Sequence, residues 1–133
     1  MSNPLYQVGF EGFNYPDTQI TVTLKAGITA ADIGAPMAVD TSAANTFKIA
    51  GDGDTIVGRL LTVEDRVNEG TLIGTVAFRF TARMKVASTA TVAVGTTVVG
   101  AGSGEVKEAA ANDHNANFVA EIVDTDYAVV VKL

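Results

Sequence analysis

The chain has 133 residues and contains neither Cys nor Trp, so disulfides, Cys-ligated zinc and thiol chemistry are excluded. Fifteen Asp and Glu residues against nine Lys and Arg give a net charge of −6, which disfavours nucleic acids and anionic membranes as partners. The first residues lack the pattern of a signal peptide, and no apolar run approaches the roughly 18 residues of a transmembrane helix. We therefore expect a soluble protein that binds no membrane.

β-Branched residues dominate the composition, with 18 Val, 7 Ile and 16 Thr against only 6 Leu. A doubly substituted Cβ is stiff at χ1 and suits a pleated sheet better than a helix. Thirteen Gly residues lie among the Val-rich runs and supply turns at short intervals. The sequence predicts an all-β fold, a compact β-barrel or β-sandwich of about seven to nine short strands.

Residues 1–17 differ from the rest of the chain, because they hold four of its nine aromatic residues without any strand or helix period. We interpret them as an extended N-terminal arm, followed by a single β-domain over residues 18–133. Exposed rings close together promote aggregation, so the arm must cover them either on its own domain or on a partner. Aromatic residues often anchor interfaces, which makes these four candidate partner-binding residues. They are Tyr6, Phe10, Phe13 and Tyr15.

In the first half of the β-domain, alternating apolar residues and turn-forming residues predict short strands around tight turns. Gln19–Leu24 alternates polar and apolar residues, as a half-buried strand does. Thr29–Gly34 combines an N-cap Thr, an acidic residue three positions later and a Gly stop, which predicts one short helical turn near residues 29–33. The other strands predicted here cover residues 37–39, 47–50 and 55–63, with turns at 40–45 and 51–54.

Leu72–Val86 is the longest alternating segment and predicts one long half-buried strand. Its outward side carries Arg79, Arg83 and Lys85. This row of cations suits an acidic partner surface or a neighbouring subunit, and cross-strand pairing with Asp or Glu explains it equally well. The remaining strands are expected at residues 91–99, 118–123 and 127–133, with turns at 100–104 and 124–126, a polar loop at 112–117, and a short helix or none at 105–111.

The sequence contains few side chains that are suited to catalysis. His114 is the one imidazole, it lies in a loop rich in Asn and Ala, and the four Ser residues occupy no nucleophile pattern. We interpret His114 as a solvated loop residue and expect a protein without catalytic residues.

Three carboxylate pairs raise the question of hydrolysis or calcium binding. Two carboxyl groups about 5 to 9 Å apart can hydrolyse glycosides, and hard cations prefer clustered oxygens. The other positions of a calcium-binding loop are absent, however, and Asp alternating with Gly is typical of tight turns. The Gly-rich run at 100–104 lacks the Lys-Ser/Thr of a phosphate loop, so we interpret it as a hairpin loop and expect no metal or cofactor. The pairs are Asp52/Asp54, Glu64/Asp65 and Asp124/Asp126.

Two segments, ITAADIGAPMAV at residues 28–39 and DGDTIVGRLLTVE at residues 52–64, resemble small capsid decoration (cement) proteins of tailed bacteriophages. The Val/Gly stretch at 95–104 and the closing Val-rich strand match the same style, so the resemblance covers roughly residues 19–133. It lies in motif order and composition rather than in an invariant signature.

The resemblance implies a non-enzymatic structural protein on the exterior of the virion capsid, made in the host cytoplasm. It further implies binding to the major capsid protein as a homotrimer or homodimer at a symmetry axis, with terminal arms that clamp adjacent subunits. The alternative is a carbohydrate-binding tail-fibre or adhesin domain. Sugar sites usually stack a ring on Trp or Tyr, and this chain has no Trp and three Tyr.

Overall fold

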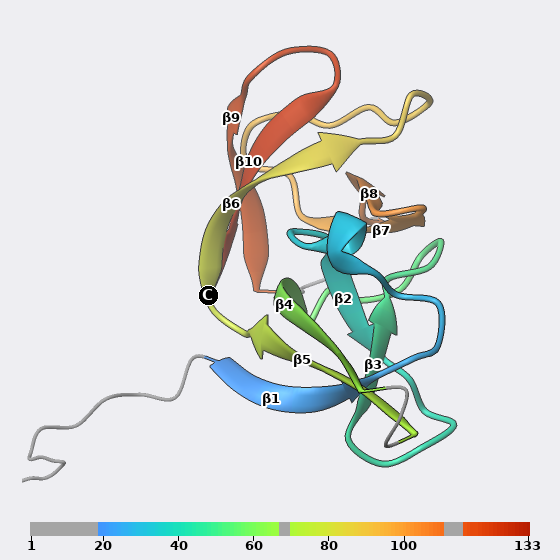
Figure 1. The fold of residues 1–133 in the computed structure, drawn as a ribbon. Coiled ribbons are helices and arrows are strands. Elements are labelled where there is room, and N and C mark those ends of the chain that lie inside the picture. The colour runs from blue at the N-terminus through green and yellow to red at the C-terminus, as the bar shows by residue number, and fades with distance from the viewer. Residues whose placement is uncertain (1–18, 67–69, 111–115) are drawn as a thin grey trace, which may run out of the picture.

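The computed structural model describes residues 19–66, 70–110 and 116–133 (Figure 1). Within these ranges the chain forms ten strands and one three-residue 3₁₀ turn, η1 (Ala30–Asp32). The predicted all-β fold is confirmed, with somewhat more strands than expected. The arm residues Tyr6, Phe10, Phe13 and Tyr15 lie outside the described residues, as does His114.

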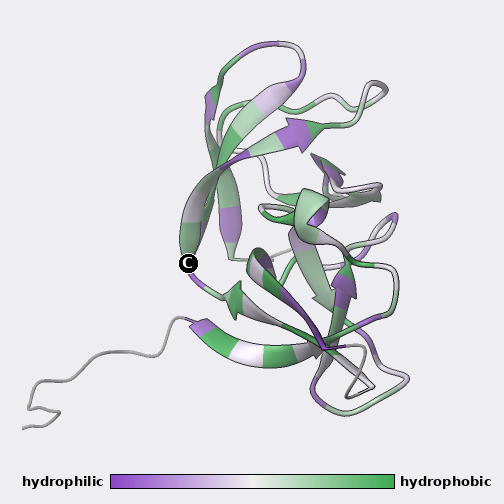
Figure 2. Cartoon of the chain, in the orientation of Figure 1, coloured by the Kyte–Doolittle hydropathy of each residue, from purple (hydrophilic) through white to green (hydrophobic). Residues whose placement is uncertain are grey.

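Five strands close into a barrel in the order β1-β3-β2-β4-β5. β1 pairs antiparallel with β5 and parallel with β3, while β2 joins β3 to β4. Figure 2 shows the alternation of apolar and polar residues along β1, whose residues Val22 and Leu24 are buried as predicted. The strands are β1 (Gln19–Leu24), β2 (Pro36–Val39), β3 (Thr46–Ile49), β4 (Gly58–Arg66) and β5 (Thr71–Ala77).

The other five strands form a second sheet in the order β7-β8-β6-β10-β9. β6 lies in its centre, parallel to β8 and antiparallel to β10. In Figure 1 this sheet lies beside the barrel, and the chain enters it directly from β5. The strands are β6 (Phe80–Val86), β7 (Val98–Gly102), β8 (Glu105–Glu108), β9 (Asn117–Ile122) and β10 (Tyr127–Lys132).

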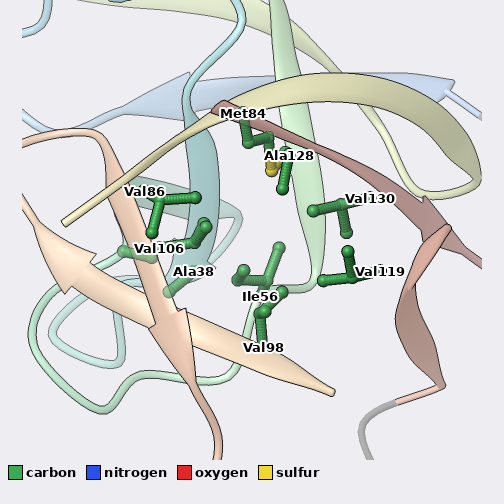
Figure 3. Close-up of a cluster of buried hydrophobic side chains, with 10 residues drawn as sticks. Ala38, Ile56, Met84, Val86, Val98, Val106, Val119, Ala128 and Val130 are labelled. Atoms are coloured by element: carbon green, nitrogen blue, oxygen red, sulfur yellow. The ribbon is translucent and has the colours of Figure 1, made fainter. Parts of the chain in front are cut away.

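The barrel and the second sheet bury side chains against each other. Ala38 of β2, together with Ala50 and Ile56 from the loop before β4, joins a cluster made mainly of residues from the second sheet (Figure 3). The preceding residue of β2, Met37, instead packs into the barrel interior with Leu60 and other residues. β2 is therefore buried on both faces. The 3₁₀ turn η1, which precedes β2 in the chain, lies beside the second sheet.

The predicted long strand over residues 72–86 is wrong in one respect, because it is two strands. β5 ends at Ala77, the chain bends at Phe78 and Arg79, and β6 begins at Phe80. Phe78 packs on the barrel core, with its ring 5.9 Å from that of Phe47, whereas Phe80 packs on the core of the second sheet. The bend thus occurs where the chain passes from one core to the other.

Three further segments differ from the expected strands or add to them. The strand expected over 91–99 begins only at Val98, since Gly95 adopts a positive φ of 88° and the segment bonds to β9 through irregular backbone contacts. A short helix or none is expected over 105–111, and the described residues 105–110 form no helix: residues 105–108 are β8, because they pair with both β7 and β6. The strand expected at 55–63 begins at Gly58 and continues to Arg66.

The turns predicted at 40–45, 51–54 and 124–126 are confirmed, whereas the one predicted over 100–104 is shorter, because residues 100–102 belong to β7. At η1 the Thr29 hydroxyl accepts the Ala31 N–H at 3.3 Å, and the Asp32 carboxylate accepts the Thr29 N–H at 2.9 Å. These two bonds form the capping box expected from the sequence. The Gly-rich run is the β7–β8 hairpin, whose turn is Ser103 and Gly104.

Candidate interaction site at the seam between the sheets

The outward cations of the predicted strand are only partly brought together. Arg83 and Lys85 lie exposed on β6 and flank the buried Met84. Arg79, by contrast, lies exposed in the bend before β6 and outside the strand. The expectation of one row of three cations is therefore right for two residues and wrong for the third, because the strand is interrupted there.

The two cations on β6 have different surroundings. Lys85 lies opposite Glu105 of β8, and its Nζ is 3.7 Å from the glutamate Oε2, so cross-strand pairing explains this residue. The guanidinium of Arg83 lies over the ring of Tyr127 on β10, 4.6 Å from its centroid. A planar guanidinium stacked on an aromatic face is held in place by cation–π attraction. No hydrogen bond or ion pair in the described part of the chain engages Arg83.

Arg83 lies at a groove of about 420 Å³ between η1 and the second sheet, which we call the seam groove. One side comes from the barrel half of the molecule, and the other comes from β6, β10 and the β7–β8 turn. Its polar and charged side chains are Asp32, Arg59, Arg83, Lys85, Ser103 and Tyr127.

Arg59 was not identified from the sequence. It lies on β4 between the buried residues Gly58 and Leu60, so period-two alternation was a signal that it points away from the barrel core. Nothing in the sequence indicated that it lines the same groove as Arg83, because that placement depends on how the barrel packs beside the second sheet. Its Nε is buried and has no hydrogen-bond partner among the described residues, a state that costs about 1–3 kcal/mol.

The backbone next to η1 lies close to Arg59. Gly34 has a φ of 97°, and a Cβ built on it would lie 3.9 Å from an Nη of Arg59. Asp32 also lines the groove, where its carboxylate is already engaged in capping η1. The groove therefore contains two arginines that have no carboxylate partner. It also contains Asp32 and Lys85, whose charged groups are already engaged by other residues.

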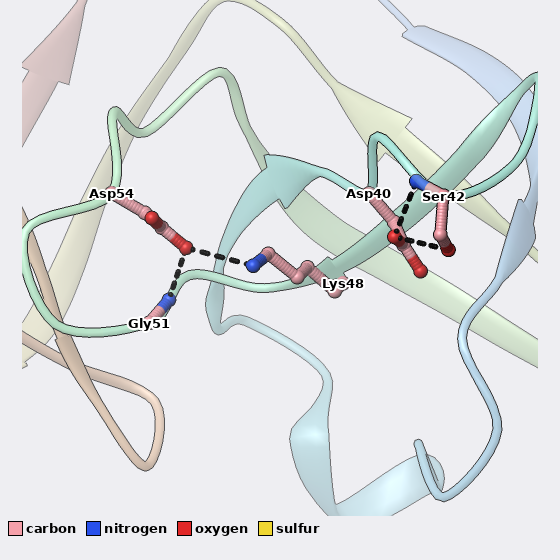
Figure 4. Close-up of polar contacts among 5 residues, drawn as sticks. All are labelled: Asp40, Ser42, Lys48, Gly51 and Asp54. Atoms are coloured by element: carbon pink, nitrogen blue, oxygen red, sulfur yellow. Dashed lines mark hydrogen bonds and ion pairs between the residues drawn. The ribbon is translucent and has the colours of Figure 1, made fainter.

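The carboxylate pairs noted in the sequence are engaged in local structure. Asp54 accepts the Gly51 N–H at 2.9 Å and pairs with Lys48 at 3.1 Å, while Asp52 pairs with Lys107. Outside these pairs, Asp40 accepts the hydroxyl and N–H of Ser42 (Figure 4). For Asp40 the hydrogen bonds from Ser42 lower the pKa, and for Asp54 the bonds from Gly51 and then Lys48 lower it. The turn interpretation of the 51–54 segment is confirmed.

The remaining acidic pairs have similar roles. Asp124 accepts the N–H groups of Asp126 and Tyr127, at 2.8 and 3.0 Å, in the turn before β10. Glu64 pairs with Arg66 at 3.1 Å on β4. Within the described ranges no group of three or more His, Cys, Asp or Glu side chains has the arrangement of a metal site.

Comparison of the chain with protein-family models, curated proteins and solved structures finds no match. Among the described residues no helix has the length and apolar character needed to cross a bilayer.

Proposed function

We propose that the chain is a non-enzymatic structural protein that binds the outer surface of a phage capsid and bridges adjacent major capsid protein subunits. It acts as a homotrimer or homodimer at a capsid symmetry axis. Each copy contributes a modest interface, and the symmetry of the lattice multiplies these contributions, so the head is stabilised by multivalency rather than by one tight site.

The observation that carries this proposal is the outward face of the second sheet. Arg83 and Tyr127 form a stacked pair there, and Phe118 of β9 is 37% exposed beside the half-buried Val131 of β10. Aromatic and arginine side chains with a few apolar neighbours are typical of interface centres. Together with the resemblance, this face supports a role in protein–protein contact.

The carbohydrate-binding alternative has less support. Of the three tyrosines, Tyr127 lies within the described residues, and the Arg83 guanidinium covers one face of its ring. A sugar stacks on an open ring face, so this tyrosine is a poor platform. Hits on a glycan array that survive Tyr127→Phe and are lost on Tyr127→Ala would favour the alternative.

The proposal is tested by co-sedimenting the full chain with expanded, undecorated heads of its phage, with unexpanded shells as the control. Saturable binding to expanded heads alone supports the proposal, and the copy number per head then identifies the symmetry axis. Binding to neither form contradicts it.

The arm supplies a second test. Deletion of residues 1–17 is expected to abolish binding to heads, because the arm is the segment proposed to clamp a neighbouring subunit. Far-UV circular dichroism and urea unfolding establish that the truncated chain is folded. A full-length chain with Tyr6, Phe10, Phe13 and Tyr15 changed to Ser separates the rings from the backbone of the arm. Unchanged occupancy of the heads by the truncated chain would show that the arm has no such role.

A further inference from the structure

We propose that the seam groove binds carboxylate groups of an acidic segment of a partner protein, with Arg59 and Arg83 as its anchoring residues. The inference rests on the proposed function only for the identity of the partner, a capsid subunit. The chemistry of the bound group follows from the groove itself.

The first observation is the pairing of the basic residues. Four described cations have a carboxylate within 4 Å, namely Lys48, Arg66, Lys85 and Lys107. Five have none within the described ranges, although the chain has six more acidic than basic residues, and of these five the groove lining contains Arg59 and Arg83 but not Lys25, Arg79 or Lys132. Arg59 and Arg83 line the same groove, so two arginines without an ion-pair partner are found on one surface feature.

The second observation is the state of the two arginines. Tyr127 holds the Arg83 guanidinium by stacking, which reduces the entropy lost when its N–H groups bind a ligand. Arg59 has a buried Nε without a partner, so its position lowers the stability of the free protein. Proteins commonly retain such unfavourable positions where binding needs them.

The charge balance of the groove selects a carboxylate over a phosphate. Asp32 adds a negative charge to the lining, and Glu105 already neutralises Lys85, so a small positive charge remains. That charge suits singly charged carboxylates better than a phosphate dianion. A guanidinium also binds a carboxylate through two parallel hydrogen bonds.

The apolar part of the lining favours a peptide segment over a free small anion. Ala31 and Ile33 line the groove with exposed side chains, and Ile33 is 48% exposed. The methylene groups of Asp or Glu side chains, and the backbone that carries them, can pack on these residues. We therefore infer that an acidic loop or tail is the occupant.

The test uses the full ¹⁵N-labelled chain and a blocked tetraglutamate peptide as the probe, with inorganic phosphate as the second arm. Saturable shifts are expected at the amides of Gly34, Lys85 and Gly104, with weaker effects from phosphate. Arg59→Gln and Arg83→Gln are each expected to weaken peptide binding about tenfold, whereas Arg83→Lys retains the charge and loses only part of the affinity.

Arg79→Gln is the matched control, because it removes the same charge from an exposed arginine outside the groove. It is expected to change the affinity less than twofold. Equal losses in all three Gln variants would overturn the inference, since they would indicate non-specific attraction. Tighter binding of phosphate than of peptide would overturn the carboxylate assignment. If the free chain self-associates and Arg83→Gln abolishes this self-association, the groove would be assigned to a second copy of the chain instead.

Head binding separates this inference from the proposed function. Peptide binding in the groove without head binding would retain the groove assignment and contradict the capsid role. Head binding that is unaffected by Arg59→Gln and Arg83→Gln would retain the capsid role and overturn the groove as its docking site. Urea unfolding of each variant verifies that it is folded, and Arg83→Gln tests the groove even if Arg59→Gln is too unstable.

Discussion

At the scale of single residues, Asn117 is a polar side chain with a structural role in the interior of the protein. It is 5% exposed at the start of β9, where its Oδ1 accepts the Val98 N–H at 2.8 Å and its Nδ2 donates to the Val98 carbonyl at 3.1 Å. The side-chain amide thus pairs with both backbone groups of Val98, as a neighbouring strand would.

Asn117→Ala is expected to lower the free energy of unfolding by about 2 kcal/mol or more, because it leaves a buried N–H and carbonyl unpaired. Urea unfolding monitored by circular dichroism measures the loss. Gln19→Ala removes an exposed amide from β1 and is expected to change stability by less than about 0.5 kcal/mol. Equal effects of the two substitutions would contradict this role of Asn117.

Asp54 predicts a dependence of stability on pH. Its pKa is lowered in the folded chain by the hydrogen bond from Gly51 and by Lys48, so the folded state favours the ionised carboxylate. The resulting stabilisation is complete above the ordinary carboxyl pKa of 3.8 and is lost as the pH falls below it. The stability difference between the wild type and Asp54→Asn should therefore shrink between pH 6 and pH 3. A difference that stays constant over this range would exclude the contribution.

At the scale of elements, the barrel depends on the close approach of β4 and β5. A Cβ built on Gly74 would collide with the backbone oxygen of Thr62 and would lie 2.8 Å from Leu24 Cδ1. Because backbone atoms must move to relieve the collision, this position tolerates only glycine.

Gly74→Ala is expected to destabilise the chain by about 3 kcal/mol through overpacking. The comparison is Gly27→Ala, where the added Cβ meets open space and the cost, about 1 kcal/mol, comes from the positive φ of 99°. Thermal unfolding of the two variants gives the order. A smaller loss at Gly74 than at Gly27 would show that β4 separates from β5 easily.

The sequence predicted elements well where local pattern and tertiary environment agree. β1 and the capping box of η1 are such cases. The interruption at Phe78 and Arg79 was not predictable from alternation, because apolar residues continue at every second position on both sides of it. Residues 105–111, EVKEAAA, have good helix propensity, yet residues 105–108 became β8 through pairing with two strands.

For the candidate site as well, the sequence predicted only those residues whose position follows from local pattern. The exposure of Arg83 and Lys85 follows from alternation along one strand, and it was predicted. Arg59 lines the same groove through the packing of the barrel beside the second sheet, which involves residues far apart in the chain. Such a placement has no local signature in a single sequence.

At the scale of the whole molecule, the shared core couples the two sheets. Ile56 is 1% exposed in the cluster that also contains Ala38 of the barrel and Val98, Val119 and Val130 of the second sheet. Loss of this packing therefore weakens both halves together.

Ile56→Ala is expected to cost about 2–5 kcal/mol and to leave a single unfolding transition. Hydrogen exchange should show equal loss of protection at Val22 in the barrel and Val130 in the second sheet. Ile20→Ala on β1, where the side chain is 45% exposed, serves as the control and is expected to cost less than about 1 kcal/mol. Separate transitions for the two sheets would contradict the coupling.

The outer strands of the second sheet bear on how copies of the chain can associate. The outward backbone of β7 is occupied, since Asn117 holds Val98 while Gly100 bonds to Gly53 and Asp54. Val119 of β9 bonds to Gly95 and Thr96, and the charged Glu121 lies further along the same strand. Blocked and charged edges prevent strand-by-strand polymerisation into fibres. In a protein built this way, any association between copies has to use side-chain surfaces rather than free backbone groups.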